Sequence, residues 1–136
     1  MQNPPPGLTG KSSTGLDENI AALLSYIFGW VSGLVFFLIE KDSKLVRFHA
    51  MQSILLNVLI AIVCFAGWIV TLVLVLILAQ VADVMGTLAG LIASLIWLII
   101  GAALLITFIL CLVRAYQGKF FKLPIIGNMA EKIVNK

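Results

Sequence analysis

Charged side chains are scarce in this chain, and most of its length contains none. Only 11% of the 136 residues are Asp, Glu, Lys or Arg, whereas 62% are hydrophobic, and a soluble domain usually carries about 25% charged residues. No Lys or Arg lies within the long hydrophobic runs, so no basic stripe interleaved with aromatic side chains is available to bind nucleic acid. The composition therefore indicates a membrane protein, with the lipid bilayer as its first partner, and excludes a nucleic-acid-binding one.

Groups that hold metals or carry out covalent catalysis are nearly absent too. Cys64 and Cys111 are the two cysteines, and both lie inside apolar runs where a thiol behaves as a small hydrophobe, so no disulfide is predicted. His49 is the single histidine, and no CxxC motif or carboxylate cluster accompanies it to bind a metal. The sequence has no nucleophile–base pair and no glycine-rich phosphate loop. We therefore expect no catalytic site, no metal, no cofactor and no enzymatic activity.

Three long uncharged runs make up most of the chain. The first covers residues 19–39, which as a helix would be about 31 Å long, close to the hydrocarbon thickness of a bilayer. The other two cover residues 50–80 and 84–113 and would be about 46 and 45 Å long, so they must tilt, bend or extend into the headgroups. The predicted fold is an all-α integral membrane protein with three transmembrane helices and a short C-terminal interfacial amphipathic segment.

The two ends of the chain differ from the runs and from each other. Residues 1–18 are rich in Pro, Gly, Ser and Thr, which predicts a flexible N-terminal tail because too little apolar surface is present to offset the entropy of ordering. The three-helix transmembrane domain then covers residues 19–116. Residues 117–136 alternate aromatic and basic residues around Gly and Pro. They predict an interfacial C-terminal tail, with its rings at headgroup level and its lysines at lipid phosphates.

The basic residues predict how the chain crosses the membrane. One lies in the first tail, three in the link after residue 39, none between the second and third runs, and five after residue 113. With three crossings the link and the final tail share a side, and cytoplasmic loops are the ones enriched in Lys and Arg. We therefore expect a multi-pass protein of the prokaryotic cytoplasmic (inner) membrane, with its N-terminus outside and its C-terminus cytoplasmic.

Small residues recur in the first and third runs at helical spacing, which in lipid lets helix backbones approach closely. They are Ser25, Gly29 and Gly33 in the first run and Gly86, Gly90, Ser94 and Gly101 in the third. We expect these faces to pack within one chain, and a dimer interface is the alternative.

The second run begins with a polar stripe that falls on one helix face. It consists of His49, Gln52, Ser53 and Asn57. One interpretation is a hydrated groove in which His49 changes charge near neutral pH. The alternative, which we favour, is that these side chains hydrogen-bond neighbouring helices, since polar residues near a membrane interface need no transport pathway. The charges just before the stripe, in residues 40–47, are expected to be solvated topology signals that are dispensable one at a time.

Three segments carry a family resemblance. They read ENIAALLSYIFGW, FFLIEKDSKLVRFHAMQS and RAYQGKFFKLPIIG. Residues 17–132 as a whole resemble a group of small, uncharacterised bacterial and archaeal membrane proteins. That group is placed loosely with the Tic-like proteins, named after a channel subunit of the chloroplast inner-envelope import machinery. The resemblance implies a membrane location and supplies no catalytic residues.

These observations favour a small multi-pass protein that is a structural or interaction component of a membrane complex. The alternative is a subunit of an oligomeric transporter or channel, including a protein-translocation-related pore, because three helices are too few to enclose a pathway alone. A proton-coupled transporter would normally carry a carboxylate in mid-membrane, and Glu40 and Asp83 both lie at the ends of runs. The protein partners that we expect are further copies of this chain or other membrane proteins.

Overall fold

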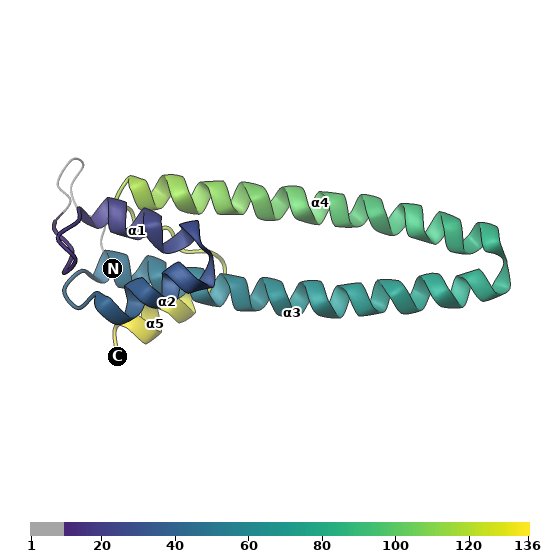
Figure 1. The fold of residues 1–136 in the computed structure, drawn as a ribbon, viewed down its shortest axis with the longest axis horizontal. Coiled ribbons are helices and arrows are strands. Elements are labelled where there is room, and N and C mark those ends of the chain that lie inside the picture. Colours follow the sequence, from purple (N-terminus) through teal and green to yellow (C-terminus); the bar gives the residue numbers. More distant parts are fainter. Residues whose placement is uncertain (1–9) are drawn as a thin grey trace. The chain divides into compact units, whose positions relative to one another are not determined.

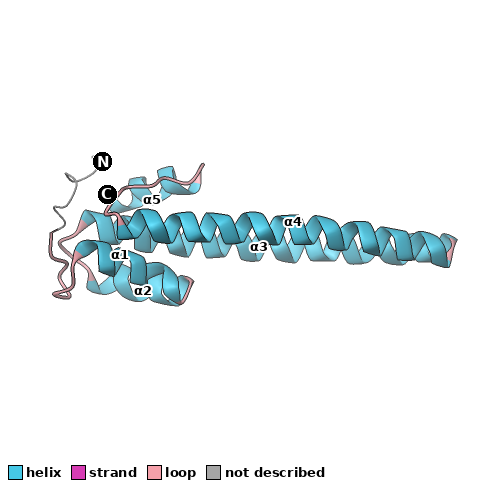
Figure 2. Ribbon diagram, turned by 90° about the horizontal axis from the view of Figure 1, so that it is seen from above, coloured by secondary structure: helices cyan, strands magenta, loops and turns pink. Residues whose placement is uncertain are grey.

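The structure, a computed structural model, describes residues 10–136, and five helices lie in that range. They are α1 (Glu18–Ile27), α2 (Trp30–Ile39), α3 (Lys44–Val81), α4 (Asp83–Tyr116) and α5 (Ile126–Val134), as Figure 1 shows. Helices and loops make up the described residues, in which no strand occurs (Figure 2), and an isolated bridge joins Lys11 to Asp17. The chain divides into two units, Met1–Leu59 with Phe108–Lys136, and Ile60–Thr107. The all-α fold class is confirmed.

Helices α3 and α4 are long and apolar enough to cross a membrane. They have 38 and 34 residues, so at about 1.5 Å per residue they are roughly 57 and 51 Å long, beyond the hydrocarbon core of about 30 Å. The second and third runs thus form helices, as predicted. Helix α3 begins at Lys44 instead of residue 50, because the hydroxyl of Ser43 accepts a hydrogen bond from the N–H of Val46 at 3.3 Å and caps the first turn.

The structure corrects the prediction of one transmembrane helix over residues 19–39. The helix breaks at Phe28 and Gly29, and Gly29 has a φ of 61°, a left-handed conformation that glycine adopts readily. The hydroxyl of Ser32 accepts a hydrogen bond from the N–H of Phe28 at 3.1 Å, which stabilises the break. Helices α1 and α2 have 10 residues each, or about 15 Å, half the hydrocarbon thickness. They pack against each other as a hairpin.

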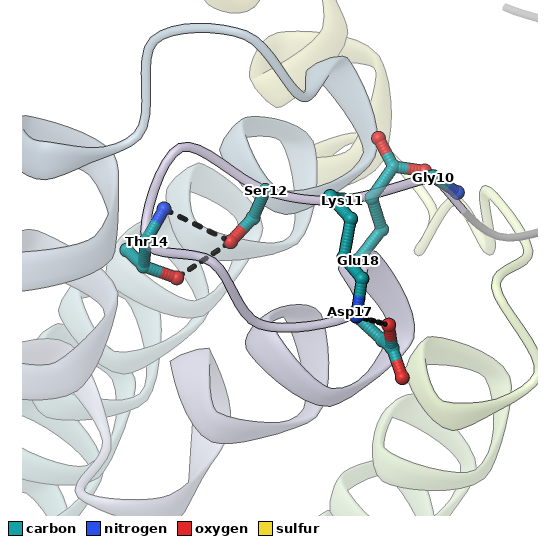
Figure 3. Close-up of polar contacts among 6 residues, drawn as sticks. All are labelled: Gly10, Lys11, Ser12, Thr14, Asp17 and Glu18. Carbon is teal, nitrogen blue, oxygen red and sulfur yellow. Dashed lines mark hydrogen bonds and ion pairs between the residues drawn. The ribbon is translucent and has the colours of Figure 1, made fainter.

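The residues before α1 are folded against the chain where they are described. The predicted flexible tail covers residues 1–18, of which positions 1–9 lie outside the described residues. Residues 10–18 form a hydrogen-bonded turn instead (Figure 3): Lys11 pairs with Asp17 at 2.5 Å, and the N–H of Gly10 donates to the carboxylate of Glu18 at 3.1 Å. This turn leads directly into α1.

Helix α5 packs on the first turns of α3 within the unit that holds both chain ends. The buried centre of this contact is formed by Phe48, Met51 and Ala130. Partly buried residues packed around it are Phe37, Leu55, Phe120, Ile133 and Val134. The rings of Phe48 and Phe120 meet edge to face at 5.5 Å. Phe120 is therefore partly buried against α3, because residues 119–123 run along that helix.

In the unit Ile60–Thr107, α3 and α4 form an antiparallel pair joined at Ala82. The N–H groups of Met85 and Gly86 donate to the carbonyl oxygen of Ala82, which closes the turn. Farther along, the indole N–H of Trp97 donates to Thr71 at 3.2 Å. Its ring lies over Gly67, where a Cβ would be 3.0 Å from a ring carbon. A larger residue at position 67 would therefore push the Trp97 ring aside at this contact between the two helices.

Candidate functional site

The polar stripe lies at the start of α3 and is almost wholly buried. The exposed fraction of His49, Gln52 and Ser53 is 0%, and Asn57 is partly exposed. Burying a polar group costs free energy unless it is hydrogen-bonded. All four side chains are hydrogen-bonded within the unit that contains both chain ends. The hydrogen-bond partners of these four side chains show which parts of the fold the stripe connects.

The hydrogen bonds of His49 fix which ring nitrogen carries the proton. Its Nε2 lies 2.7 Å from the carbonyl oxygen of Lys119, which can only accept, so Nε2 donates. In a neutral ring Nδ1 is then an acceptor, and the hydroxyl of Tyr26, 2.9 Å away, donates to it. His49 therefore bridges α1 and the segment that follows α4.

Gln52 uses every polar atom of its side chain. Nε2 donates to the hydroxyl of Tyr26 at 3.0 Å and to the carbonyl oxygen of Phe121 at 2.9 Å, while Oε1 accepts from the N–H of Leu123 at 3.1 Å. Residues 119–123 are neither helix nor strand, so the amide of Gln52 supplies partners that regular secondary structure would have supplied. Irregular backbone at membrane depth requires such partners, because lipid offers none.

Ser53 and Asn57 lie against the break between α1 and α2. The hydroxyl of Ser53 donates to the carbonyl oxygen of Gly29 at 3.1 Å. A Cβ at Gly29 would lie 3.1 Å from Oδ1 of Asn57, whose Nδ2 donates to the carbonyl of Ser53 in its own helix at 2.8 Å. Three of the four stripe residues thus hydrogen-bond other elements, and Asn57 contacts the break while bonding within α3.

Tyr26 was not among the predicted site residues, although it joins His49 to Gln52 and is only 1% exposed. The signal was present in the sequence: a buried tyrosine needs a partner for its hydroxyl, and the polar stripe offers the nearest set. Ser32 was also missed, and its hydroxyl lies 3.1 Å from the carbonyl oxygen of Ser25 as well as serving the break. The sequence signal for this role is a serine three residues after Gly29, where its hydroxyl can hydrogen-bond the backbone at the helix break.

Four of the predicted small-residue positions make close contacts, namely Gly29, which lies against Ser53 and Asn57, and Gly33, Gly86 and Ser25. A Cβ at Gly33 would be 2.9 Å from the carbonyl oxygen of Ala50, so the backbones of α2 and α3 touch there. Gly86 lies against Ala79 across the α3–α4 turn. Ser25 is buried and donates to a carbonyl oxygen one turn earlier in α1.

The other small residues of α4 face open space. Around Gly90 and Gly101 no neighbouring atom lies within 4 Å of the Cβ position. Ser94 is exposed, and its hydroxyl donates to the carbonyl oxygen of Gly90 in the same helix at 2.8 Å. Within the described part of the chain, the predicted face of α4 therefore makes a close contact at Gly86 and leaves these three positions open.

Glu40 departs most from the predicted role of residues 40–47 as solvated, dispensable charges. Its exposed fraction is 0%, and its carboxylate accepts from the N–H and hydroxyl of Ser13 at 3.0 and 2.6 Å and from the N–H of Ser43 at 2.9 Å. Burial is the largest single effect and would raise the pKa of Glu40, but the hydrogen bonds together outweigh it and hold that pKa below its ordinary value of 4.5. Glu40 therefore fastens residues 10–18 to the start of α3.

Two apolar helices of crossing length and a short hairpin tied down by buried polar side chains define a small helical membrane protein. Among residues 10–136 no group of three or more His, Cys, Asp or Glu lies together where it could hold a metal ion. The chain belongs to the MamF/MmsF family, described as the magnetosome magnetite crystal formation protein family, whose model matches residues 16–130.

Archaeal relatives agree with this assignment. A UPF0132 membrane protein of Methanocaldococcus jannaschii is 39% identical over 124 residues, which cover 90% of this chain and 94% of the relative. One of Archaeoglobus fulgidus is 33% identical over 117 residues, covering 86% and 95%. No solved structure matches the chain. The protein is thus a membrane protein, and its likeness to the Tic-like proteins stays a prediction.

Proposed function

We propose that this protein is a non-enzymatic structural or interaction component of a complex in the prokaryotic cytoplasmic membrane. The use made of the polar stripe supports this most strongly. His49, Gln52 and Ser53 direct their hydrogen bonds at α1, at the α1–α2 break and at residues 119–123. A transport pathway or a reactive site needs polar groups that face water or a ligand, and these groups are engaged in the packing of the chain itself.

The topology that we propose has two crossings, with the α1–α2 hairpin entering and leaving the membrane on one side. Ser13 hydrogen-bonds Glu40, so the turn before α1 and the link before α3 lie on the same side of the bilayer. All nine Lys and Arg fall in Met1–Leu59 or Phe108–Lys136, and none falls in Ile60–Thr107. By the positive-inside rule this topology has both termini in the cytoplasm, whereas the three crossings predicted from the sequence place the N-terminus outside.

Thiol labelling of intact cells tests this topology. Lys11, Lys41 and Val84 are exposed residues before α1, between α2 and α3, and at the start of α4. Each is replaced by Cys in a chain whose native cysteines are changed to Ala. An impermeant thiol reagent should label Val84→Cys and spare the other two until the cells are permeabilised. Labelling of Lys11→Cys with protection of Lys41→Cys would restore three crossings and reject this topology.

Affinity purification and flux measurements test the function itself. After purification in mild detergent we expect foreign membrane proteins in stoichiometric amounts. In vesicles reconstituted with the pure chain we expect solute flux no greater than in empty vesicles. A flux that disappears in Asn57→Leu and persists in the control Thr107→Val would reject the structural role, because Asn57 is the stripe residue without a bond to another element, and Thr107 bonds only within α4.

The second candidate is a subunit of an oligomeric transporter or channel, including a protein-translocation-related pore. Open space at Gly90 and Gly101 favours it, since small residues without an internal neighbour suit contact with another copy. Cysteine cross-linking in membranes tests this idea. A disulfide dimer formed by Ser94→Cys, which lies between those glycines, and not by the exposed control Ile106→Cys would support a second copy on this face of α4.

A further inference from the structure

The segment after α4 follows α3 away from the end that begins at Lys44. The carbonyl oxygen of Lys119 meets His49, and Phe121 and Leu123 meet Gln52, three residues farther along the helix. Three residues correspond to about 4.5 Å along a helix axis. Between residues 119 and 123 the chain therefore runs along α3 in the direction away from Lys44.

The chain then reverses at Pro124 and Ile125. The N–H of Ile126 donates to the carbonyl oxygen of Pro124 at 2.7 Å. A Cβ at Gly127 would lie 2.6 Å from Cα of Lys122. The first turn of α5 therefore touches the backbone of the segment that precedes the reversal. Figure 2 shows α5 running back toward the marked C-terminus, and the core contact of Ala130 with Phe48 and Met51 places the middle of α5 on the first turns of α3.

The exposed face of residues 119–136 is apolar near the reversal at Pro124 and Ile125, and basic near the C-terminus. Ile125 is 75% exposed and Met129, one turn later, is 47% exposed. Lys132 continues this exposed face of α5, and Lys136, which follows the end of the helix, is exposed as well. The acid of α5, Glu131, pairs with Lys122 at 2.5 Å, so its charge is balanced by a lysine of the outgoing segment.

Ile125 also holds a conformation that costs free energy. It is the non-glycine residue with positive φ, 67°, among residues 10–136, and with its ψ of −59° and the hydrogen bond from Ile126 to Pro124 it forms the rare, strained kind of γ-turn. In water an exposed isoleucine at such a position would gain nothing in return. In hydrocarbon the same side chain is favourable, which accounts for an apolar residue at the tip of the reversal.

We propose that residues 119–134 form a re-entrant loop that inserts Ile125 and Met129 among the acyl chains of one leaflet, with Lys132 and Lys136 bound to anionic phospholipid headgroups. Gln52 lies eight residues after Lys44, so the loop reaches about 12 Å below the start of α3, less than half of a core of about 30 Å. The inference rests on the proposed topology only in placing the start of α3 at a membrane surface. It holds whichever side that surface faces.

Depth-dependent quenching on the full-length chain tests the proposal. Ile125→Cys and Met129→Cys, in a chain with both native cysteines changed to Ala, carry an environment-sensitive fluorophore in phosphatidylcholine vesicles with or without phosphatidylglycerol. Lipids with spin labels at different acyl positions should quench both probes from within the hydrocarbon. The probe at residue 125 should lie deeper than the probe at residue 129. A probe reached better by an aqueous quencher than by the lipid quenchers would overturn the insertion.

Charge reversal tests the headgroup contact. Lys132→Glu with Lys136→Glu should make the probe at residue 125 shallower in vesicles that contain phosphatidylglycerol and leave it unchanged in pure phosphatidylcholine. The matched control is Lys41→Glu with Lys44→Glu, which alters charge by the same amount at exposed residues outside the loop. Equal effects of the two pairs would reject specific binding by α5. Sidedness is measured separately by labelling of Lys11→Cys, so failure of the topology and failure of the loop give different results.

Discussion

Replacing Gln52 with Leu should destabilise the protein more than any other single change in the polar stripe. Gln52 makes three hydrogen bonds, to Tyr26, to the carbonyl of Phe121 and to the N–H of Leu123. Leucine has a similar size, so the substitution removes polarity without opening a large cavity. The backbone groups of Phe121 and Leu123 are then left without their side-chain partner beside α3.

The size of the effect follows from the bonds lost. Interhelical hydrogen bonds in membrane proteins average about 0.6 kcal/mol, with a maximum of about 1.7 kcal/mol. Three such bonds predict a loss of about 2 kcal/mol in the free energy of unfolding, and at most about 5 kcal/mol. Tyr26→Phe removes the hydroxyl that serves His49 and Gln52 but leaves both backbone contacts, so about 1 kcal/mol is expected.

The measurement is equilibrium unfolding of the purified chain in mixed micelles with increasing sodium dodecyl sulfate. Ser94→Ala is the control, because the hydroxyl of Ser94 is exposed and bonds only within α4. Limited proteolysis after Lys119 and Lys122 reports on the segment that Gln52 holds, and Gln52→Leu should accelerate it. If Gln52→Leu unfolds within about 0.3 kcal/mol of the Ser94→Ala control, below the average bond of about 0.6 kcal/mol, the stripe does not hold the fold together and the reasoning fails.

Three further changes test other contacts. The folded protein lowers the pKa of Glu40 below 4.5, so its stabilisation is complete at neutral pH and is lost as pH falls below about 4.5; Glu40→Gln should be less stable at pH 7 and should show a shallower acid unfolding slope. Gly33→Val should destabilise by more than about 2 kcal/mol, because its Cβ would meet the carbonyl oxygen of Ala50 at 2.9 Å; an unchanged midpoint in micelles would contradict the close packing of α2 on α3. Gly67→Val should displace the ring of Trp97 and shift its fluorescence emission, and an unshifted spectrum relative to Gly90→Val would contradict that contact.

The sequence alone predicts the two long apolar helices, because hydropathy depends only on residues that are close together in the chain. The long helices over residues 50–80 and 84–113 appear close to their predicted bounds, as α3 and α4. Helical spacing also placed His49, Gln52 and Ser53 on one buried face. Both properties depend on residues within a few turns of one another, and no distant partner is needed to see them.

Only the tertiary structure shows how residues 19–39, Glu40 and residues 119–123 are arranged around α3. The first run carries no charge and has the length of a crossing, yet it breaks at Gly29, because Ser53 supplies a hydrogen bond from 24 residues away. Glu40 looks solvated in sequence and is buried because Ser13 folds back onto it. Residues 119–123 can leave helical structure because Gln52, 71 residues before Leu123, hydrogen-bonds the carbonyl oxygen of Phe121 and the N–H of Leu123. Composition therefore determined that the chain enters the membrane, and long-range hydrogen bonding determined where its backbone turns within the fold.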